Sequence, residues 1–145
     1  MTTTTRSGGC LCGAVRYEAR GVRPEVSACH CAMCRRWCSG PLFAVPVEAL
    51  RYLAGEDGAL RTVTSSPWAE RGFCASCGSG LFFRVTKEGP HQGFTTVALG
   101  TLDDQTGITL NREWFSDLEP AAYHLEGERE RLTSAQIAAM FPDVG

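Results

Sequence analysis

The sequence Cys74-Ala-Ser-Cys77-Gly78 places two thiols three positions apart and follows them with a glycine, as in half of a tetrahedral metal site. A structural zinc needs four thiolates or imidazoles, so this pair requires partners from elsewhere in the chain. The segment Cys10-Leu-Cys12-Gly13 offers a second pair, also followed by glycine. A metal shared by the two pairs would close a long loop and staple the N-terminal part of the chain to its middle. We therefore predict a structural site made by Cys10, Cys12, Cys74 and Cys77.

The cysteine content suits either disulfides or metal sites, because eight cysteines occur in only 145 residues. The start of the chain, residues 1–9, is polar and lacks the apolar core of a secretory signal peptide. We therefore expect a cytoplasmic protein, in whose reducing compartment disulfides rarely persist. Tight cysteine pairs without a βαβ pattern also favour metal ligation over a redox dithiol.

Composition narrows the class of protein further. Hydrophobic residues make up 43% and charged residues 21% of the chain, close to the average for globular proteins. No apolar run approaches the roughly 20 residues that a membrane helix requires, so we expect no membrane partner. The net charge is −2 and Lys87 is the single lysine, which argues against a nucleic-acid partner.

The hydrophobic pattern predicts a mainly β fold with a few short helices. Alternating or β-branched runs predict five strands, at residues 14–20, 41–47, 60–64, 80–86 and 93–99. The prolines in 41–47 suggest that this strand lies at the edge of a sheet. Helical signals are confined to 32–38 and to 133–141, which begins with capping residues and stops before Pro142. We expect a flexible tail over residues 1–7 and one zinc-binding domain over residues 8–145.

A second cluster, Cys29-His-Cys31-Ala-Met-Cys34, offers three thiolates within six residues. Three protein ligands with one open position are typical of a catalytic zinc, so we predict this role for Cys29, Cys31 and Cys34. Cys38 lies one helical turn after Cys34 and is either a fourth ligand that closes the site or a small buried residue. We favour the buried residue.

Each of several other residues has either a functional or a structural interpretation. His30 lies between two predicted ligands, and we expect it to point away and bond to the backbone. His91, in a loop, is more simply solvated than an acid–base group. Three aromatic residues either line a pocket beside the metal or pack in the core: Trp37, Phe43 and Trp68. Three arginines either bind a carboxylate or serve as solvated or structural residues: Arg35, Arg36 and Arg71.

Together these segments resemble the glutathione-dependent formaldehyde-activating enzyme (GFA) family, whose domain is also called the centromere protein V/GFA domain. The resemblance covers nearly the whole chain and rests on three cysteine blocks in the family's order: residues 8–17, 29–37 and 71–79. Two further similar blocks are residues 99–104 and 113–123.

This resemblance implies an Mss4-like β fold built around zinc. It also implies two Zn²⁺ ions per chain, a structural one on the four-cysteine set and a catalytic-type one on Cys29, Cys31 and Cys34. The implied activity is that of a carbon–sulfur lyase acting on a thiol–aldehyde adduct such as S-hydroxymethylglutathione, with a small-molecule thiol such as glutathione as partner. No segment identifies a glutathione pocket, so the substrate rests on analogy alone.

Two other functions compete with this one. A non-enzymatic zinc module for a protein partner would be favoured if Cys38 closed the second site. A zinc ribbon that binds nucleic acid is disfavoured by the net charge. Four thiolates suit iron as well as zinc, and the sequence does not indicate an oligomeric state.

Overall fold

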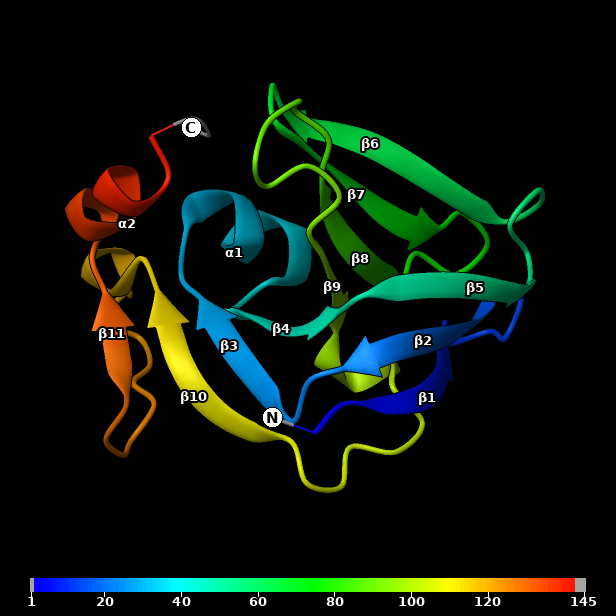
Figure 1. Ribbon diagram of the computed structural model, residues 1–145, viewed down its shortest axis with the longest axis horizontal. Helices are drawn as coiled ribbons and strands as arrows, with labels where there is room; N and C mark the ends of the chain where they lie inside the picture. The colour runs from blue at the N-terminus through cyan, green and yellow to red at the C-terminus, as the bar shows by residue number, and fades with distance from the viewer. Residues whose placement is uncertain (1, 143–145) are drawn as a thin grey trace.

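The computed structural model describes residues 2–142 and confirms a mainly β fold with two short α-helices among them. Met1 and residues 143–145, the ends of the predicted tail and of the predicted domain, lie outside the described residues. The strands form two sheets (Figure 1). The smaller sheet has the order β1-β2-β5, with bounds Thr4–Gly9, Arg16–Val22 and Ala49–Ala54.

The larger sheet runs β11-β10-β3-β4-β9-β8-β7-β6. In chain order its strands are β3 (Glu25–Cys29), β4 (Leu42–Val47), β6 (Leu60–Ser66), β7 (Ala69–Cys74), β8 (Gly80–Val85), β9 (Thr95–Ala98), β10 (Thr109–Trp114) and β11 (Glu130–Leu132). Strand β10 pairs in parallel with both β3 and β11, whereas the other neighbours are antiparallel. As a result the C-terminal part of the chain extends the sheet beyond β3 (Figure 1).

Helix α1 (Ala32–Cys38) connects β3 to β4, and helix α2 (Ser134–Met140) follows β11. Two short 3₁₀ turns, η1 (Leu99–Thr101) and η2 (Ser116–Leu118), complete the regular structure. Helix α2 begins with the capping box expected from the sequence, in which Thr133 and Gln136 bond to each other's backbone N–H groups. Among residues 2–142, no helix is long and apolar enough to cross a membrane.

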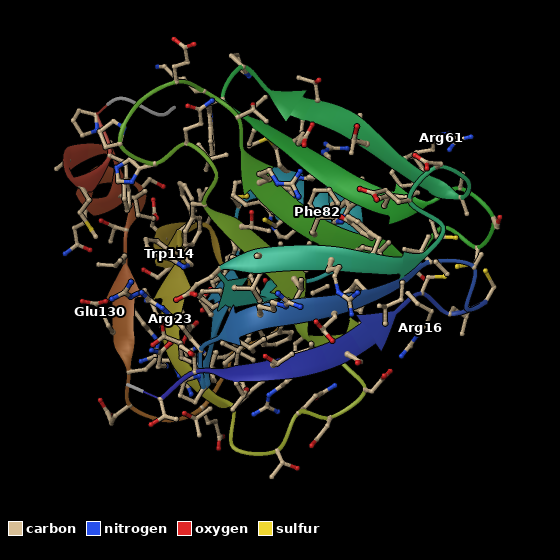
Figure 2. All side chains as sticks on the ribbon, turned by 45° about the vertical axis from the view of Figure 1, so that its right-hand side comes forward. Arg16, Arg23, Arg61, Phe82, Trp114 and Glu130 are labelled. Atoms are coloured by element: carbon tan, nitrogen blue, oxygen red, sulfur yellow. The ribbon has the colours of Figure 1, made fainter. Side chains whose placement is uncertain are left out.

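The core lies between the two sheets. Strand β2 contributes fully buried side chains that pack against buried residues of β3, β4, β8 and β9: Tyr17, Ala19 and Val22. Figure 2 shows Phe82, one of these core residues, on β8. The structure confirms the half-buried strand predicted for residues 14–20, because the side of β2 that carries Tyr17 and Ala19 faces the core.

Two predictions differ from the structure. Residues from Thr4 onward are not a flexible tail but strand β1, because they pair with β2 and Arg6 donates to the carbonyl oxygens of Asp104 and Thr106. Strand β4 is not an edge strand, because it lies between β3 and β9. Pro46 is tolerated there because the pairing with β3 ends at Ala44, so its missing N–H removes no bond on that side.

Candidate metal centres

The structure brings the sulfur atoms of Cys10, Cys12, Cys74 and Cys77 together, all within 4.8 Å of one another. We call this group the four-cysteine cluster. The Cys10–Cys12 and Cys12–Cys74 sulfur pairs lie 3.7 and 3.9 Å apart. A tetrahedron with sulfurs about 2.3 Å from its centre has edges of about 3.8 Å, so the donor set fits a zinc ion. The eight cysteines are free thiols, and the tight pairs are not disulfides.

Two sharp turns shape the four-cysteine cluster. Gly13 and Gly78 have φ values of +81° and +82°, a left-handed conformation that favours glycine, and they follow the two cysteine pairs as the sequence predicted. The N–H of Val15 points at the Cys10 sulfur at 3.2 Å. The Ser79 hydroxyl lies 3.2 Å from the Cys77 sulfur, and hydrogen bonds from Ser79 lower the pKa of Cys77 to about 5. These donors favour thiolates, the form that binds metal.

The sulfurs of Cys29, Cys31 and Cys34, also within 4.8 Å of one another, form a second group that we call the three-cysteine cluster. Cys29 ends β3, Cys31 caps the N-terminus of α1, and Cys34 lies in the first turn of that helix. The Cys31 sulfur accepts a hydrogen bond of 3.3 Å from the backbone N–H of Cys34. The strand end and the helix start therefore aim three thiols at one point.

The proximity of these sulfurs separates their pKa values. Hydrogen bonds from Cys29 and Cys34 lower the pKa of Cys31 to about 2. The same sharing of protons raises the pKa of Cys29 well above its usual range. The proximity of the three sulfurs therefore favours the thiolate at Cys31, the form that binds a soft divalent ion.

Cys38 does not join the three-cysteine cluster. Its thiol donates to the carbonyl oxygen of Cys34 at 3.1 Å, as an ordinary helix side chain does, and its side chain is exposed. The fourth position is therefore not closed by a cysteine of residues 2–142. The interpretation of Cys38 as a non-ligand is supported, although the residue is not buried.

His30 is fully buried and points away from the sulfurs, as expected, but its partners are side chains and not the backbone. Its Nε2 lies 2.7 Å from Glu113 on β10, and its Nδ1 lies 2.9 Å from the Tyr123 hydroxyl. The other oxygen of Glu113 accepts from Arg129 at 2.6 Å and from Arg131 at 2.8 Å. We call these five residues the Glu113 network. The sequence does not predict this network, because its members are up to 101 residues apart in the chain.

The oxygens of Glu113 and Glu119 lie close enough to His30 to resemble a third metal site. Arg129 and Arg131 already neutralise Glu113, however, so a cation there would meet two positive charges. The Glu113 network is better described as a buried support for His30, which connects the end of β3 at Cys29 to the N-cap of α1 at Cys31.

Arg71 is the predicted arginine that reaches the three-cysteine cluster. Its side chain is 4% exposed, and its Nη2 lies 3.6 Å from the Cys34 sulfur. The guanidinium carbon lies over the rings of Trp37 and Phe83, 5.8 and 5.4 Å from their centroids. Of the three aromatic residues, Trp37 lines a small cavity with Arg71 and Phe83, whereas Phe43 packs against the core and Trp68 packs on Phe83. None of the three cysteines lines this cavity.

The remaining candidates serve structure. Arg35 donates from Nε to the carbonyl oxygen of His30 at 2.9 Å, which ties α1 to the end of β3. His91 contacts the ring of Phe141 edge-on. Neither residue lies in the two cysteine clusters.

Comparison with known proteins shows the family of the chain and a related fold. The family model of the glutathione-dependent formaldehyde-activating enzyme matches residues 5–117. An uncharacterized lyase of the yeast Schizosaccharomyces pombe is 39% identical over 130 residues, which are 90% of this chain and 92% of the yeast protein. A crystal structure of a Rhodobacter sphaeroides protein, 22% identical, superposes with a TM-score of 0.56 over 72% of this chain and 99% of that one, so the fold is shared. From the residues matched and from the yeast relative, the chain belongs to the glutathione-dependent formaldehyde-activating enzyme family.

Proposed function

We propose that the protein is a zinc-dependent carbon–sulfur lyase that cleaves and forms the adduct of a thiol with a small aldehyde, S-hydroxymethylglutathione being the first candidate. The observation that carries the proposal is the three-cysteine cluster, which offers three sulfurs and leaves Cys38 outside. Three protein ligands with a fourth position open to substrate are the arrangement of catalytic zinc sites. The family match and the lyase name of the yeast relative support the same class of reaction.

The two clusters would have different roles. The four-cysteine cluster offers a complete tetrahedral donor set and would hold a structural zinc between the N-terminal segment and the end of β7. Zinc binding is worth about 10–16 kcal/mol in small zinc domains, comparable to the roughly 5–15 kcal/mol that stabilises a whole domain. Cys29, Cys31 and Cys34 would hold the second ion, which when bound supplies a Lewis acid and stabilises a thiolate at neutral pH.

The chain's own residues define what happens around that position. Cleavage breaks the C–S bond, returns its electron pair to sulfur, and turns the C–O bond into a carbonyl as the hydroxyl proton passes to water. Arg71, 3.6 Å from Cys34, places positive charge beside the sulfurs and so offsets the negative charge of a leaving thiolate. The Glu113 network holds His30 in place. His30 in turn positions its two chain neighbours, Cys29 and Cys31.

NMR exchange spectroscopy tests the proposal. Glutathione, formaldehyde and their adduct interconvert spontaneously, and we expect protein with two zinc ions per chain to accelerate this exchange. A Cys34→Ser variant should lose the second ion and the acceleration while remaining folded, and Cys38→Ser is the matched control that should keep both. Equal exchange rates with and without the parent protein would refute the activity on this adduct.

A zinc module that only binds a protein partner is the alternative outcome. The parent protein would then hold two zinc ions, fail to accelerate exchange with glutathione or with other low-molecular-weight thiols, and keep its fold. Metal analysis of protein purified under reducing conditions without chelator therefore precedes the exchange experiment.

A further inference from the structure

We propose that Arg71 is the oxyanion-binding residue of the three-cysteine cluster, donating its unpartnered Nε–H group to the oxygen of the thiol–aldehyde adduct. This inference rests on the proposed function and deepens it. It assigns a catalytic contact to a residue outside the cysteine ligands.

The first observation is the lack of partners at a buried charge. Arg71 is 96% buried, yet among residues 2–142 neither its Nε nor its Nη1 has a hydrogen-bond acceptor. Leaving such a donor unsatisfied costs about 1–3 kcal/mol, and more when the group is charged. The Cys34 sulfur satisfies Nη2 only. The Nε–H lies on the same edge of the guanidinium as Nη2, so it can donate to an acceptor that binds beside the Cys34 sulfur.

The second observation is how the guanidinium is held. The guanidinium carbon lies over the rings of both Trp37 and Phe83, and these rings limit its movement. Trp37 comes close because residue 80 is glycine, where a Cβ atom would lie 2.6 Å from the indole nitrogen. The Arg71 guanidinium is therefore positioned before substrate arrives, as a preorganised donor must be.

The third observation is the size of the space beside it. Arg71, Trp37 and Phe83 line a small cavity with residues of β4, β8 and β9, of which Thr96 is polar. It leaves about 10 Å³ for the centre of a water-sized group, roughly the room that one oxygen-sized ligand atom needs. This space is too small for a carboxylate, which argues against Arg71 as the residue that binds a remote acidic group of the substrate.

The chemistry creates charge at that oxygen. In cleavage the hydroxyl of R–S–CH₂–OH loses its proton to water, the alkoxide electrons form the C=O bond, and the C–S bond electrons leave on sulfur. In formation the thiolate adds to the carbonyl carbon and negative charge develops on the carbonyl oxygen before water protonates it. An N–H donor aimed at this oxygen stabilises the transition state more than the neutral substrate.

Arg71→Met, with Arg84→Met as control, tests the role. Arg84 lies on neighbouring β8, stacks on Phe82 and pairs with Glu70, and Glu70 and Arg71 are adjacent on β7 and so face opposite sides of the sheet. We expect Arg71→Met to lower kcat by about 100–1,000-fold, the effect of removing an oxyanion donor. The KM for the adduct and the content of two zinc ions should stay within threefold of the parent, and the control should keep its kcat. Retention of kcat within threefold in Arg71→Met would overturn the proposal.

A binding measurement on the parent protein covers the cases in which the variant loses metal or the parent is inactive. The Nε–H signal of Arg71, assigned by its loss in Arg71→Met or Arg71→Lys, is followed by ¹H–¹⁵N NMR. We expect it to move on addition of S-hydroxymethylglutathione and not of S-methylglutathione, which lacks the oxygen. A signal unmoved by the adduct overturns the Arg71 proposal. An inactive parent whose signal moves refutes the lyase activity while supporting the oxygen-binding role.

Discussion

Removal of the Glu113 carboxylate should destabilise the protein strongly, although the residue lies outside both cysteine clusters. Glu113 is fully buried and accepts from three side chains, His30, Arg129 and Arg131, at 2.6–2.8 Å. In Glu113→Ala the buried His30 and the Arg129 side chain, which is 9% exposed, lose this charged acceptor. Breaking one partner of a buried ion pair costs about 3–5 kcal/mol. For a chain of this size the loss corresponds to a fall in Tm of roughly 6–20 °C.

The assay is urea or thermal unfolding at fixed zinc concentration under reducing conditions, because metal binding itself shifts apparent stability. Glu130→Ala is the matched control. Figure 2 shows Glu130 on β11 at the outer side of the sheet and Trp114 on neighbouring β10. Glu130 is 52% exposed and pairs with Arg112, so its loss should cost at most about 1 kcal/mol. A loss of under 1 kcal/mol in Glu113→Ala, equal to that in the control, would refute the idea that Glu113 holds a buried charge network.

The same residue predicts a pH dependence. Burial raises the pKa of Glu113, but hydrogen bonds from Arg129 and His30 and the nearby positive charges lower it by more, so the net shift is downward. A carboxyl group with a lowered folded-state pKa stabilises the protein above its unfolded value, about 4.3, and loses this effect as pH falls through the folded value. The stability gap between parent and Glu113→Gln should therefore be full at pH 6–7 and shrink below about pH 4.

Three shorter predictions follow from individual contacts. Cys74→Ser should remove the structural metal and unfold the protein, seen as loss of one zinc ion and of dispersed amide signals; a folded variant with one zinc would refute the staple. Cys38→Ala should cost at most about 1 kcal/mol in unfolding experiments and leave metal content unchanged, because the thiol bonds only to backbone carbonyls; loss of a zinc ion would make Cys38 a ligand. Gly72→Val should destabilise by about 1–3 kcal/mol or more, because a Cβ there would lie 2.1 Å from the Phe82 ring; unchanged unfolding would show that the ring moves freely.

The elements predicted from sequence are those with a strong local signal. The helix at residues 32–38 has the bounds of α1, and strands 14–20, 60–64 and 80–86 overlap β2, β6 and β8. Strands β1, β3, β5, β7, β10 and β11 were not predicted. Most are short or rich in polar residues, and β10 is held by parallel pairing to β3, whose partner residues lie 84–85 positions away. No local window contains that information.

The cysteine clusters could be predicted because their spacing within each pair is itself the signal. The residues behind them could not. Glu113 looks like one charge among several in residues 109–114, and only the sheet order shows that it faces His30. The sequence predicts that Arg71 either binds a carboxylate or makes a structural hydrogen bond. Its position over the rings of Trp37 and Phe83 depends on contacts between α1, β7 and β8, which the sequence does not show.

The position of the four-cysteine cluster in the chain has a consequence for biosynthesis. Cys12 and Cys77 are separated by 65 residues, so a ribosome working at roughly 5–20 residues per second needs about 3–13 s to make the second pair after the first. During that interval Cys10 and Cys12 are exposed on a nascent chain as thiols whose partners do not yet exist. The three-cysteine cluster, contained in residues 29–34, is translated in about a second and is not exposed to this delay. Oxidants present during translation should therefore affect the thiols of the four-cysteine cluster more than those of the three-cysteine cluster.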